Sequence, residues 1–228
     1  MLSLGGSILL KDDSDPDFIR GFIALIRELS GNNKFIIVTG GGRTARDFIN
    51  IGRELGTDEA ALDSLGIEAT RLNSWLVLGA MGDAAYPRPF TSIEEAILGA
   101  STHGVAVGGG THPGHTTDAV SALIAERWGA DLFLNLTAVK GAYTSDPNED
   151  PDAAWIPKMT SGELVELVSK TSRGAGSHSV LDPLAAAIVH RAGIRTGILN
   201  GRNLKALGSA LTGRGFEGTI IESSKGGA

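Results

Sequence analysis

The sequence predicts an α/β fold, a three-layer αβα sandwich around a mainly parallel sheet. Short apolar runs of strand length alternate along the chain with longer segments whose apolar residues recur at helical spacing, a pattern typical of a parallel sheet covered on both faces. Three of these runs end at glycines, at 5–6, 40–42 and 108–110. Because ligands bind at the carboxyl ends of parallel strands, we expect the binding site at these three loops.

The first half of the chain is predicted to contribute three buried strands and five helices. Strands are predicted at 1–4, 35–38 and 105–107, where the apolar runs are continuous or nearly so. Helices are predicted from the cap Asp15-Pro16 to about Leu29, over 43–55, over 58–81, from the capping box of Thr91 and Glu94 to Leu98, and from about Thr116 onward.

The second half continues the alternation after a long interruption. The predicted elements are a strand at 132–136, an irregular polar stretch at 137–158, a helix capped by Thr160 and Glu163, a flexible Gly/Ser-rich stretch at 171–181, a helix at 182–192, a strand at 194–199, a helix from Asn203 to Leu211 and a strand at 219–221. Structureless stretches as long as 137–158 are often functional. We expect one domain over 1–222 and a disordered tail at 223–228.

Composition excludes several classes of protein. The net charge of −6 comes without a basic stripe, so no nucleic-acid partner is expected. No apolar run approaches the ~20 residues that span a bilayer, so no membrane partner is expected. The absence of cysteine excludes disulfides and thiolate metal sites, and it is compatible with a reducing cytoplasm.

The predicted helix over 58–81 is unusually apolar in its second half, which contains Leu72, Trp75, Leu76, Val77 and Leu78. On a monomer such a helix is either deeply buried or leaves an exposed patch. We favour an exposed patch that lies in a subunit interface, and we predict a homo-oligomer built from dimers.

The loop between the predicted strand at 105–107 and the helix that follows suits an anion, most often phosphate. Glycines let the backbone approach a ligand, and a helix N-terminus offers unpaired N–H groups and the positive end of a dipole. Thr111, Thr116 and Thr117 add hydroxyl donors. A single glycine-rich loop of this kind could equally well serve only to connect a strand to a helix. Because this chain has three such loops, we favour phosphate binding.

Two familiar phosphate-binding motifs fit less well. The P-loop pattern G-x-x-x-x-G-K-[ST] does not occur. Residues 40–45 satisfy the dinucleotide pattern G-x-G-x-x-A, and Asp63 stands roughly 20 residues further on. In the dinucleotide fold that acid ends a strand, whereas Asp63 lies in a predicted helix, so the dinucleotide interpretation is disfavoured.

Five segments together resemble the amino-acid-kinase family, and more closely the archaeal-type UMP kinases within it. They are Gly-Gly-Gly-Arg-Thr-Ala-Arg at 40–46, Thr-Arg-Leu-Asn at 70–73, Gly-Gly-Thr-His-Pro-Gly-His-Thr-Thr-Asp-Ala-Val at 109–120, Gly-Ala-Tyr-Thr-Ser-Asp-Pro at 141–147 and Asp-Pro-Leu-Ala at 182–185. The resemblance covers nearly the whole chain, and the Thr-His-Pro-Gly-His-Thr-Thr-Asp run with the Tyr-Thr-x-Asp-Pro loop is its most specific part.

The resemblance implies the amino-acid-kinase fold, Mg²⁺-dependent transfer of a phosphoryl group from ATP to UMP in pyrimidine nucleotide synthesis, and a cytoplasmic hexamer arranged as a trimer of dimers. It implies a UMP half at about 1–130 and an ATP half at about 131–222. The implied ATP-binding residues are Gly5, Gly6, Ser7, Gly42, Arg46, Thr137, Tyr143 and Asp146. The implied UMP-binding residues are Gly41, Asp63, Thr111, His112, Pro113, Gly114, His115, Thr116 and Thr117.

Arg46, Asp118 and Lys158 are the expected catalytic residues. Asp118 follows the third glycine loop, residues 109–117, which we call the acceptor loop, and lies in the first turn of a helix, where the dipole favours a carboxylate. Asp118 could instead be a helix cap, but Thr116 and Thr117 are available for that role. Family members often have a lysine in the first strand, and 1–4 has none. Lys158 is therefore expected to be the cationic partner of Asp118.

Several roles have a second interpretation. His112 and His115 could form a metal pair, although hydrogen bonding within their loop is favoured and no protein metal site is predicted. Lys140 stands where UMP kinases usually have Asp, and it either faces the nucleotide or is solvated. The protein could also be another small-molecule kinase of the family, or a non-catalytic nucleotide-binding or storage subunit.

Overall fold

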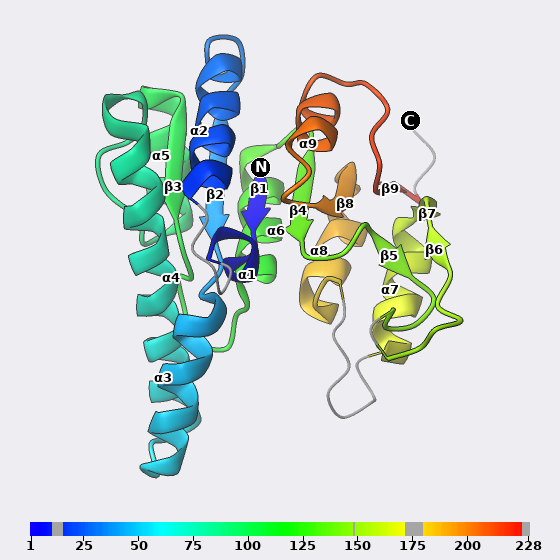
Figure 1. Ribbon diagram of the computed structural model, residues 1–228, viewed down its shortest axis with the longest axis horizontal. Helices are drawn as coiled ribbons and strands as arrows, with labels where there is room; N and C mark the ends of the chain where they lie inside the picture. Colours follow the sequence, from blue (N-terminus) through cyan, green and yellow to red (C-terminus); the bar gives the residue numbers. More distant parts are fainter. Residues whose placement is uncertain (11–15, 148, 172–179, 225–228) are drawn as a thin grey trace.

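The computed structural model describes residues 1–10, 16–147, 149–171 and 180–224, and its centre is a seven-stranded sheet (Figure 1). The strand order is β3-β2-β1-β4-β8-β9-β7. The first five strands in this order are parallel, β9 is antiparallel to β8, and β7 is parallel to β9. The predicted mainly parallel sheet is confirmed.

The strands in that sheet are β1 (Leu2–Leu4), β2 (Phe35–Thr39), β3 (Val105–Gly108), β4 (Phe133–Thr137), β7 (Lys158–Thr160), β8 (Thr196–Asn200) and β9 (Thr219–Glu222). A separate antiparallel pair consists of β5 (Ala142–Tyr143) and β6 (Trp155–Ile156). The helices are α1 (Gly6–Leu9), α2 (Pro16–Ser30), α3 (Gly42–Glu54), α4 (Glu59–Met81), the 3-10 turn η1 (Gly82–Ala84), α5 (Ile93–His103), α6 (Thr117–Trp128), α7 (Ser161–Thr171), α8 (Pro183–Ala192) and α9 (Leu204–Leu211).

Helices cover both faces of the sheet because the strand residues alternate in direction. In β2, Ile36 and Val38 pack into one core with α5, α6, α7 and α8. Phe35 and Ile37 pack into a second core with α1, α2, α4 and α9. This gives the three predicted layers.

α3 and the adjoining part of α4 pack on each other and extend beyond the carboxyl ends of the strands, at the lower left in Figure 1. The apolar half of α4 divides between two environments. Val77 and Leu78 are buried under the sheet, whereas Leu72, Trp75 and Leu76 remain 60%, 53% and 43% exposed. We call these three residues the α4 patch.

Local chemistry explains most helix starts. Asp58, Thr116, Asp182 and Asn203 each accept a hydrogen bond from a backbone N–H in the first turn of the following helix. Pro183 occupies the first position of α8, where it costs no hydrogen bond. The predicted box of Thr160 and Glu163 is confirmed, because Glu163 accepts from Thr160 N and donates its own N–H to Thr160 Oγ1.

Several predicted details were wrong. The N-cap of α5 is Ser92 rather than Thr91, and the acid that bonds back to the cap region is Glu95 rather than Glu94, since Thr91 N donates to Glu95 Oε2. α5 also continues to His103 rather than ending at Leu98. The stretch 137–158 contains β5, β6 and the start of the edge strand β7. The first glycine loop begins a one-turn helix. Ser224, expected in the tail, is hydrogen-bonded to the start of α7.

Some expectations lie outside the described residues. They concern Asp15 as a helix cap, the flexibility of 172–179 and the disorder of 225–228. None of the helices in the described part of the chain combines the length and the apolar character that a membrane span requires.

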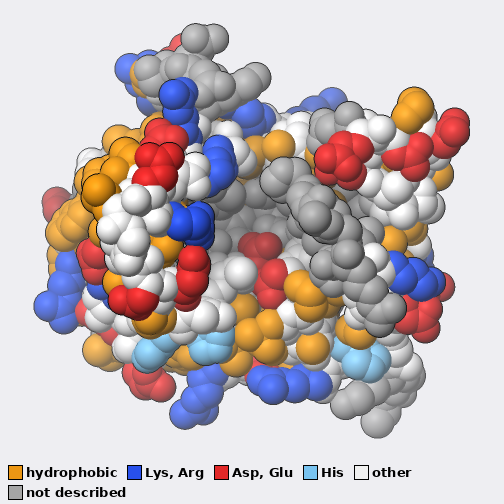
Figure 2. Space-filling view, turned by 90° about the horizontal axis from the view of Figure 1, so that it is seen from below, with side chains coloured by type: hydrophobic (Ala, Val, Ile, Leu, Met, Phe, Trp, Pro, Cys, Tyr) orange, Lys and Arg blue, Asp and Glu red, His pale blue; other side chains and the backbone are white. Residues whose placement is uncertain are grey.

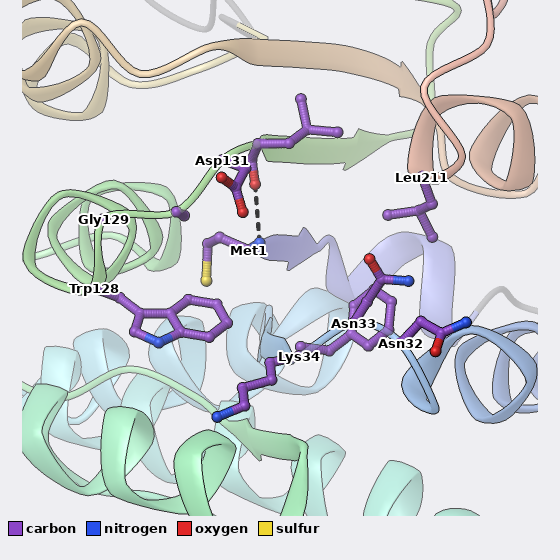
Figure 3. A pocket seen from close by; sticks show the side chains of 11 residues that line it. Met1, Asn32, Asn33, Lys34, Trp128, Gly129, Asp131 and Leu211 are labelled. Atoms are coloured by element: carbon purple, nitrogen blue, oxygen red, sulfur yellow. Dashed lines mark hydrogen bonds between the residues drawn. The ribbon is translucent and has the colours of Figure 1, made fainter.

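A pocket of about 400 Å³ lies at the amino ends of the strands, whereas the glycine loops lie at the carboxyl ends (Figure 3). Lys34 and Trp128 line it beside Met1, whose N–H donates to Leu132 O at 2.9 Å. These residues precede β2 and β4, so the pocket is at the amino ends of the strands and separate from the site described next.

Candidate active site

The three glycine loops meet at the carboxyl ends of β1, β2 and β3. Figure 2 looks onto this edge and shows a hollow in the middle of the face, with acidic side chains at its floor. The sequence prediction that these loops share one site is supported because the first two loops contact each other and Thr70 contacts both the second and the third.

The first two glycine loops touch through their backbones. A Cβ atom on Gly6 would lie 2.2 Å from Gly42 N and 2.6 Å from Gly40 O. Gly42 has a φ of +61°, a conformation that L side chains rarely adopt. Glycine is therefore required at these positions by backbone packing, and the N-terminal N–H groups of α1 and α3 are brought to the same place.

The third loop closes over Asp63. Asp63 Oδ2 accepts a hydrogen bond of 2.7 Å from Gly114 N, although 51 residues separate the two in sequence. A cavity of about 160 Å³ lies between α3, α4 and this loop, lined on the loop side by His112, His115 and Thr117. Asp63 lines the same cavity. Of the residues that the sequence analysis placed on the UMP side, the structure brings Asp63, His112, His115 and Thr117 to this cavity and bonds Gly114 to Asp63, whereas Gly41, Thr111, Pro113 and Thr116 do not line it.

The two histidines stack edge to face. The His112 and His115 ring centroids are 6.5 Å apart with an interplanar angle of 78°, and His115 N donates to His112 O. Gly114, between them, has a φ of +81°. Pro113 and Gly114 are exposed at the tip of the loop, while Thr111 is half-buried.

Thr116 links the acceptor loop to the second half of the chain. Its Oγ1 accepts from Ala119 N as the cap of α6 and donates to Asp182 Oδ2. Asp182 Oδ1 in turn accepts from the first N–H groups of α8, those of Leu184 and Ala185. One pair of side chains therefore connects the starts of two helices across the site.

Asp118 is a half-buried carboxylate in the first turn of α6, where Ser3 Oγ of β1 donates to its Oδ1 at 2.9 Å. The pKa of Asp118 is raised from 3.8 to about 6, mainly by burial and also by the nearby negative charge of Asp182, while hydrogen bonds from Ser3 and Asn135 oppose the shift. A carboxylate with a pKa perturbed in this way, next to the carboxyl end of β1 and the N-terminus of α6, is typical of functional sites.

The residues expected to bind ATP lie on several elements. Gly5, Gly6 and Ser7 form the turn into α1, and Ser7 is exposed. Thr137 ends β4, where its Oγ1 accepts from Val139 N at 3.0 Å. Arg46 is exposed on α3, and Arg43, three residues before it, is ion-paired with Asp47 at 3.4 Å.

The stretch after β4 contains the other expected ATP contacts. Tyr143 is in β5, paired with Trp155 of β6, and Asp146 O accepts from the N–H groups of two following residues in the turn. Lys140 is held against the same pair of strands. Its Nζ lies 3.7 Å from the centroid of the Trp155 ring and 3.0 Å from Glu217 Oε1.

Lys158 does not lie beside Asp118, and the predicted pairing is corrected. Lys158 begins β7 at the edge of the sheet and forms an ion pair of 2.9 Å with Glu222. Asp118 contacts Ser3 in β1, and three strands lie between β1 and β7. At about 4.8 Å per strand the separation is roughly 19 Å, beyond the reach of a lysine side chain.

Sequence analysis did not single out Ser3, and it gave no role to Thr70 and Asn73, although both belong to a segment that carries the family resemblance. Ser3 interrupts the otherwise apolar run at 1–4, so it was a signal for a polar group facing the site. Thr70 and Asn73 are three residues apart in an apolar helix, the spacing of one helix face. Both contact the glycine loops.

Comparisons with known proteins agree with this geometry. Residues 2–200 match the model of the amino acid kinase family. A uridylate kinase of Methanospirillum hungatei is 46% identical over 222 residues, which cover 97% of this chain and 93% of the relative. One from Pyrococcus abyssi is 40% identical over 97% of this chain and 98% of the relative. The crystal structure of a uridylate kinase from Archaeoglobus fulgidus superposes with a TM-score of 0.86 at 40% identity, covering 96% of this chain and 98% of that one.

Proposed function

The chain belongs to the amino acid kinase family, and we propose that it is a UMP kinase, which transfers the γ-phosphoryl group of ATP to UMP to give ADP and UDP for pyrimidine nucleotide synthesis. The observation that carries the proposal is the hydrogen bond from Gly114 N of the acceptor loop to Asp63 Oδ2. The other two glycine loops contact each other nearby. Nearly full-length relatives with the name uridylate kinase support it.

On the acceptor side, the cavity next to Asp63 would hold UMP. A carboxylate can accept hydrogen bonds from ribose hydroxyls. Because the carboxylate is charged, these hydrogen bonds are stronger than those between two neutral groups. The residues from Thr111 to Thr117 would hold the UMP phosphate, because the loop contributes glycine N–H groups, threonine hydroxyls and the N-terminus of α6.

On the donor side, the N–H groups at the starts of α1 and α3 would contact the ATP phosphates, and Arg46 would neutralise part of their charge. Thr137, Tyr143 and Asp146 would contact the nucleoside part of ATP from the stretch after β4. Phosphoryl transfer needs mainly positioning and charge neutralisation, so no covalent nucleophile is required.

Asp118 would lie beside the phosphoryl group in transfer. Its carboxylate is the kind of ligand that Mg²⁺ prefers, and the burial that raises its pKa would be offset by a nearby cation. Mg²⁺ bound with ATP would supply neutralisation of phosphate charge. Ser3 holds the carboxylate in place through its hydrogen bond.

The proposed function is tested by a coupled ADP-release assay with UMP, CMP, dUMP, carbamate, acetylglutamate and isopentenyl phosphate as acceptors. We expect the highest kcat/KM with UMP. A different best acceptor would replace this assignment with a sister kinase of the family. Tight ATP binding without turnover of any acceptor would instead indicate a non-catalytic nucleotide-binding protein.

Asp63→Ala is expected to raise KM for UMP by about ten- to a hundredfold, because hydrogen bonds to a charged group contribute ~1.5–3 kcal/mol. KM for ATP should stay within about twofold. Steady-state kinetics with each substrate varied in turn measures both values. Glu68→Gln on the same helix is the control, since its exposed pair with Arg71 should matter little. An unchanged KM for UMP would remove Asp63 from the UMP site.

We also propose that the protein is a cytoplasmic homo-oligomer built from dimers, with a hexamer as the expected assembly. The α4 patch supports it, because Leu72, Trp75 and Leu76 form an exposed apolar surface on a single helix. Trp75→Glu is expected to shift the protein to smaller species in sedimentation at micromolar concentration. Leu184→Glu, which also changes an exposed leucine, should leave the assembly intact. A wild-type monomer at this concentration would contradict the proposal.

A further inference from the structure

α4 has a buried polar face that the proposed function leaves unexplained. Thr70, Asn73 and Ser74 are only 5%, 2% and 0% exposed, in a helix whose other buried residues are mostly apolar. Burying polar groups is unfavourable unless they are hydrogen-bonded. The partners of these side chains therefore indicate what the face does.

Asn73 holds the second glycine loop. Its Nδ2 donates to Gly40 O at 2.7 Å and to Gly41 O at 3.2 Å. In a trans peptide the C=O and N–H groups point in opposite directions. Fixing these two carbonyls toward α4 therefore directs the N–H groups of Gly41 and Gly42 away from α4. Gly42 N lies next to Gly6 of the first loop, as the short distance to a Gly6 Cβ atom shows.

Thr70 holds the start of the acceptor loop. Its Oγ1 accepts from Gly110 N at 2.8 Å and donates to Ile67 O at 2.6 Å. Gly109 packs directly on it, because a Cβ atom there would lie 2.1 Å from Thr70 Oγ1. Thr70 and Asn73 are three residues apart, about 4.5 Å along the helix axis.

Ser74 and Thr39 complete the face without bonding to either loop segment. Thr39 Oγ1 donates to Thr70 O at 2.8 Å and lies 2.9 Å from Ser74 Oγ, which itself donates to Thr70 O at 3.0 Å. The bond from Thr39 joins the end of β2 to the backbone of α4, whereas the bond from Ser74 to Thr70 O stays within the helix. Ser74 is therefore a buried hydroxyl on the same face that holds neither the loops nor the contact between α4 and β2.

We propose that Thr70 and Asn73 are positioning residues that set the separation between the donor and acceptor phosphates. Asn73 fixes the glycine loop that adjoins the ATP side, and Thr70 fixes the loop that holds the UMP phosphate. Both project from one turn of one helix, so the two loops keep a constant spacing. The proposal rests on the proposed function for the identity of the ligands, but not for the loop geometry.

The test compares changes of matched size. Thr70→Val keeps the shape and removes the hydroxyl, whereas Thr70→Ser keeps the hydroxyl and should restore function. Asn73→Asp keeps the shape but turns both donors into acceptors that face carbonyl oxygens. Ser74→Ala, one residue further on, is the control for loss of a buried hydroxyl.

We expect Thr70→Val to raise KM for UMP and to lower kcat, each by about tenfold, since a buried N–H loses its acceptor. Asn73→Asp should raise KM for both substrates and lower kcat by roughly ten- to a hundredfold. In Thr70→Ser and Ser74→Ala, kcat, KM for UMP and KM for ATP should each stay within about twofold of the wild-type value. Thermal unfolding of each variant separates these effects from loss of folded protein.

Amide hydrogen exchange without substrates tests the geometry independently of the reaction. The Gly110 amide should exchange about tenfold faster or more in Thr70→Val than in Thr70→Ser, and residues 40–42 should respond in the same way to Asn73→Asp. Equal kinetics and equal exchange in Thr70→Val and Thr70→Ser would overturn the proposal while leaving the UMP kinase assignment intact. A wild type inactive on UMP would defeat that assignment, and exchange alone would then decide the positioning role.

Discussion

Asp118→Asn is expected to lower kcat by about 100-fold or more, equivalent to ~3 kcal/mol, while making the folded protein more stable at pH 8. The substitution keeps the size of the side chain and an oxygen that can accept from Ser3 Oγ, so it removes mainly the charge. If the charge stabilises the transition state, substrate affinities should stay similar. A residue that served only as structural support would tolerate this change.

The stability effect follows from the raised pKa. Burial raises the pKa of Asp118 from 3.8 to about 6, so the folded protein binds a proton more readily than the unfolded chain between these values. Stability therefore falls as the pH rises from about 4 to 6, and the full cost of roughly 2–3 kcal/mol is present above pH 6. Asp118→Asn lacks this ionisation. The difference in unfolding free energy between Asp118→Asn and the wild type should therefore grow from about pH 4 to 6 and then stay constant.

Kinetics and thermal unfolding between pH 4.5 and 8.5 measure both effects. In the wild type, kcat/KM for ATP should rise with an apparent pKa near 6 as Asp118 ionises, because this ratio reports the enzyme before ATP and Mg²⁺ bind, and this step should be absent in Asp118→Asn. Ser3→Ala combined with Asp118→Asn should give non-additive losses, because the two side chains act together. Glu94→Gln, an exposed first-turn acid of α5, is the control. Near-normal kcat in Asp118→Asn would end the proposal for this residue.

Gly6→Ala is expected to abolish most of the activity, with kcat/KM reduced by about 100-fold or more, and to destabilise the fold by roughly 1–3 kcal/mol. The new methyl group would lie 2.2 Å from Gly42 N and 2.6 Å from Gly40 O, both backbone atoms that cannot rotate away. The first two glycine loops would have to separate, and the N–H groups at the starts of α1 and α3 would no longer converge.

Gly31→Ala provides the matched control for this prediction. A Cβ atom at Gly31 would have no heavy atom within 4 Å in the described part of the chain, so neither activity nor melting temperature should change by much. Gly6→Ala should in contrast lower the melting temperature by several degrees, since 1 kcal/mol corresponds to about 2–4 °C for a protein of this size. Full activity in Gly6→Ala would show that the contact of the two loops is not needed for transfer.

The order of elements and the place of the site could be predicted from the sequence because both depend on local signals. The apolar run at 35–38 and the helical spacing of Phe18 and Phe22 reflect periodicities of the backbone itself. Glycines at the ends of successive parallel strands must meet at one edge of the sheet. That rule places residues 5–6, 40–42 and 108–110 together without knowledge of the strand order.

Some element boundaries were less predictable. Ser92 and Thr91 are both competent caps, and only the backbone geometry at Ser92 selects it. The two-residue strands β5 and β6 have too few residues to show any periodicity, and they exist because each pairs with the other.

Contacts between distant segments were decided by the tertiary structure alone. The strand order sends β7 to the far edge of the sheet, and Lys158 therefore pairs with Glu222 instead of Asp118. The distribution of the apolar half of α4 between core and surface depends on how that helix is rotated against the sheet. The sequence by itself determined the layers, the family and the loops that form the site. The partners of Asp118, Thr70 and Asn73 required the fold, because they depend on distances across the sheet that no local periodicity specifies.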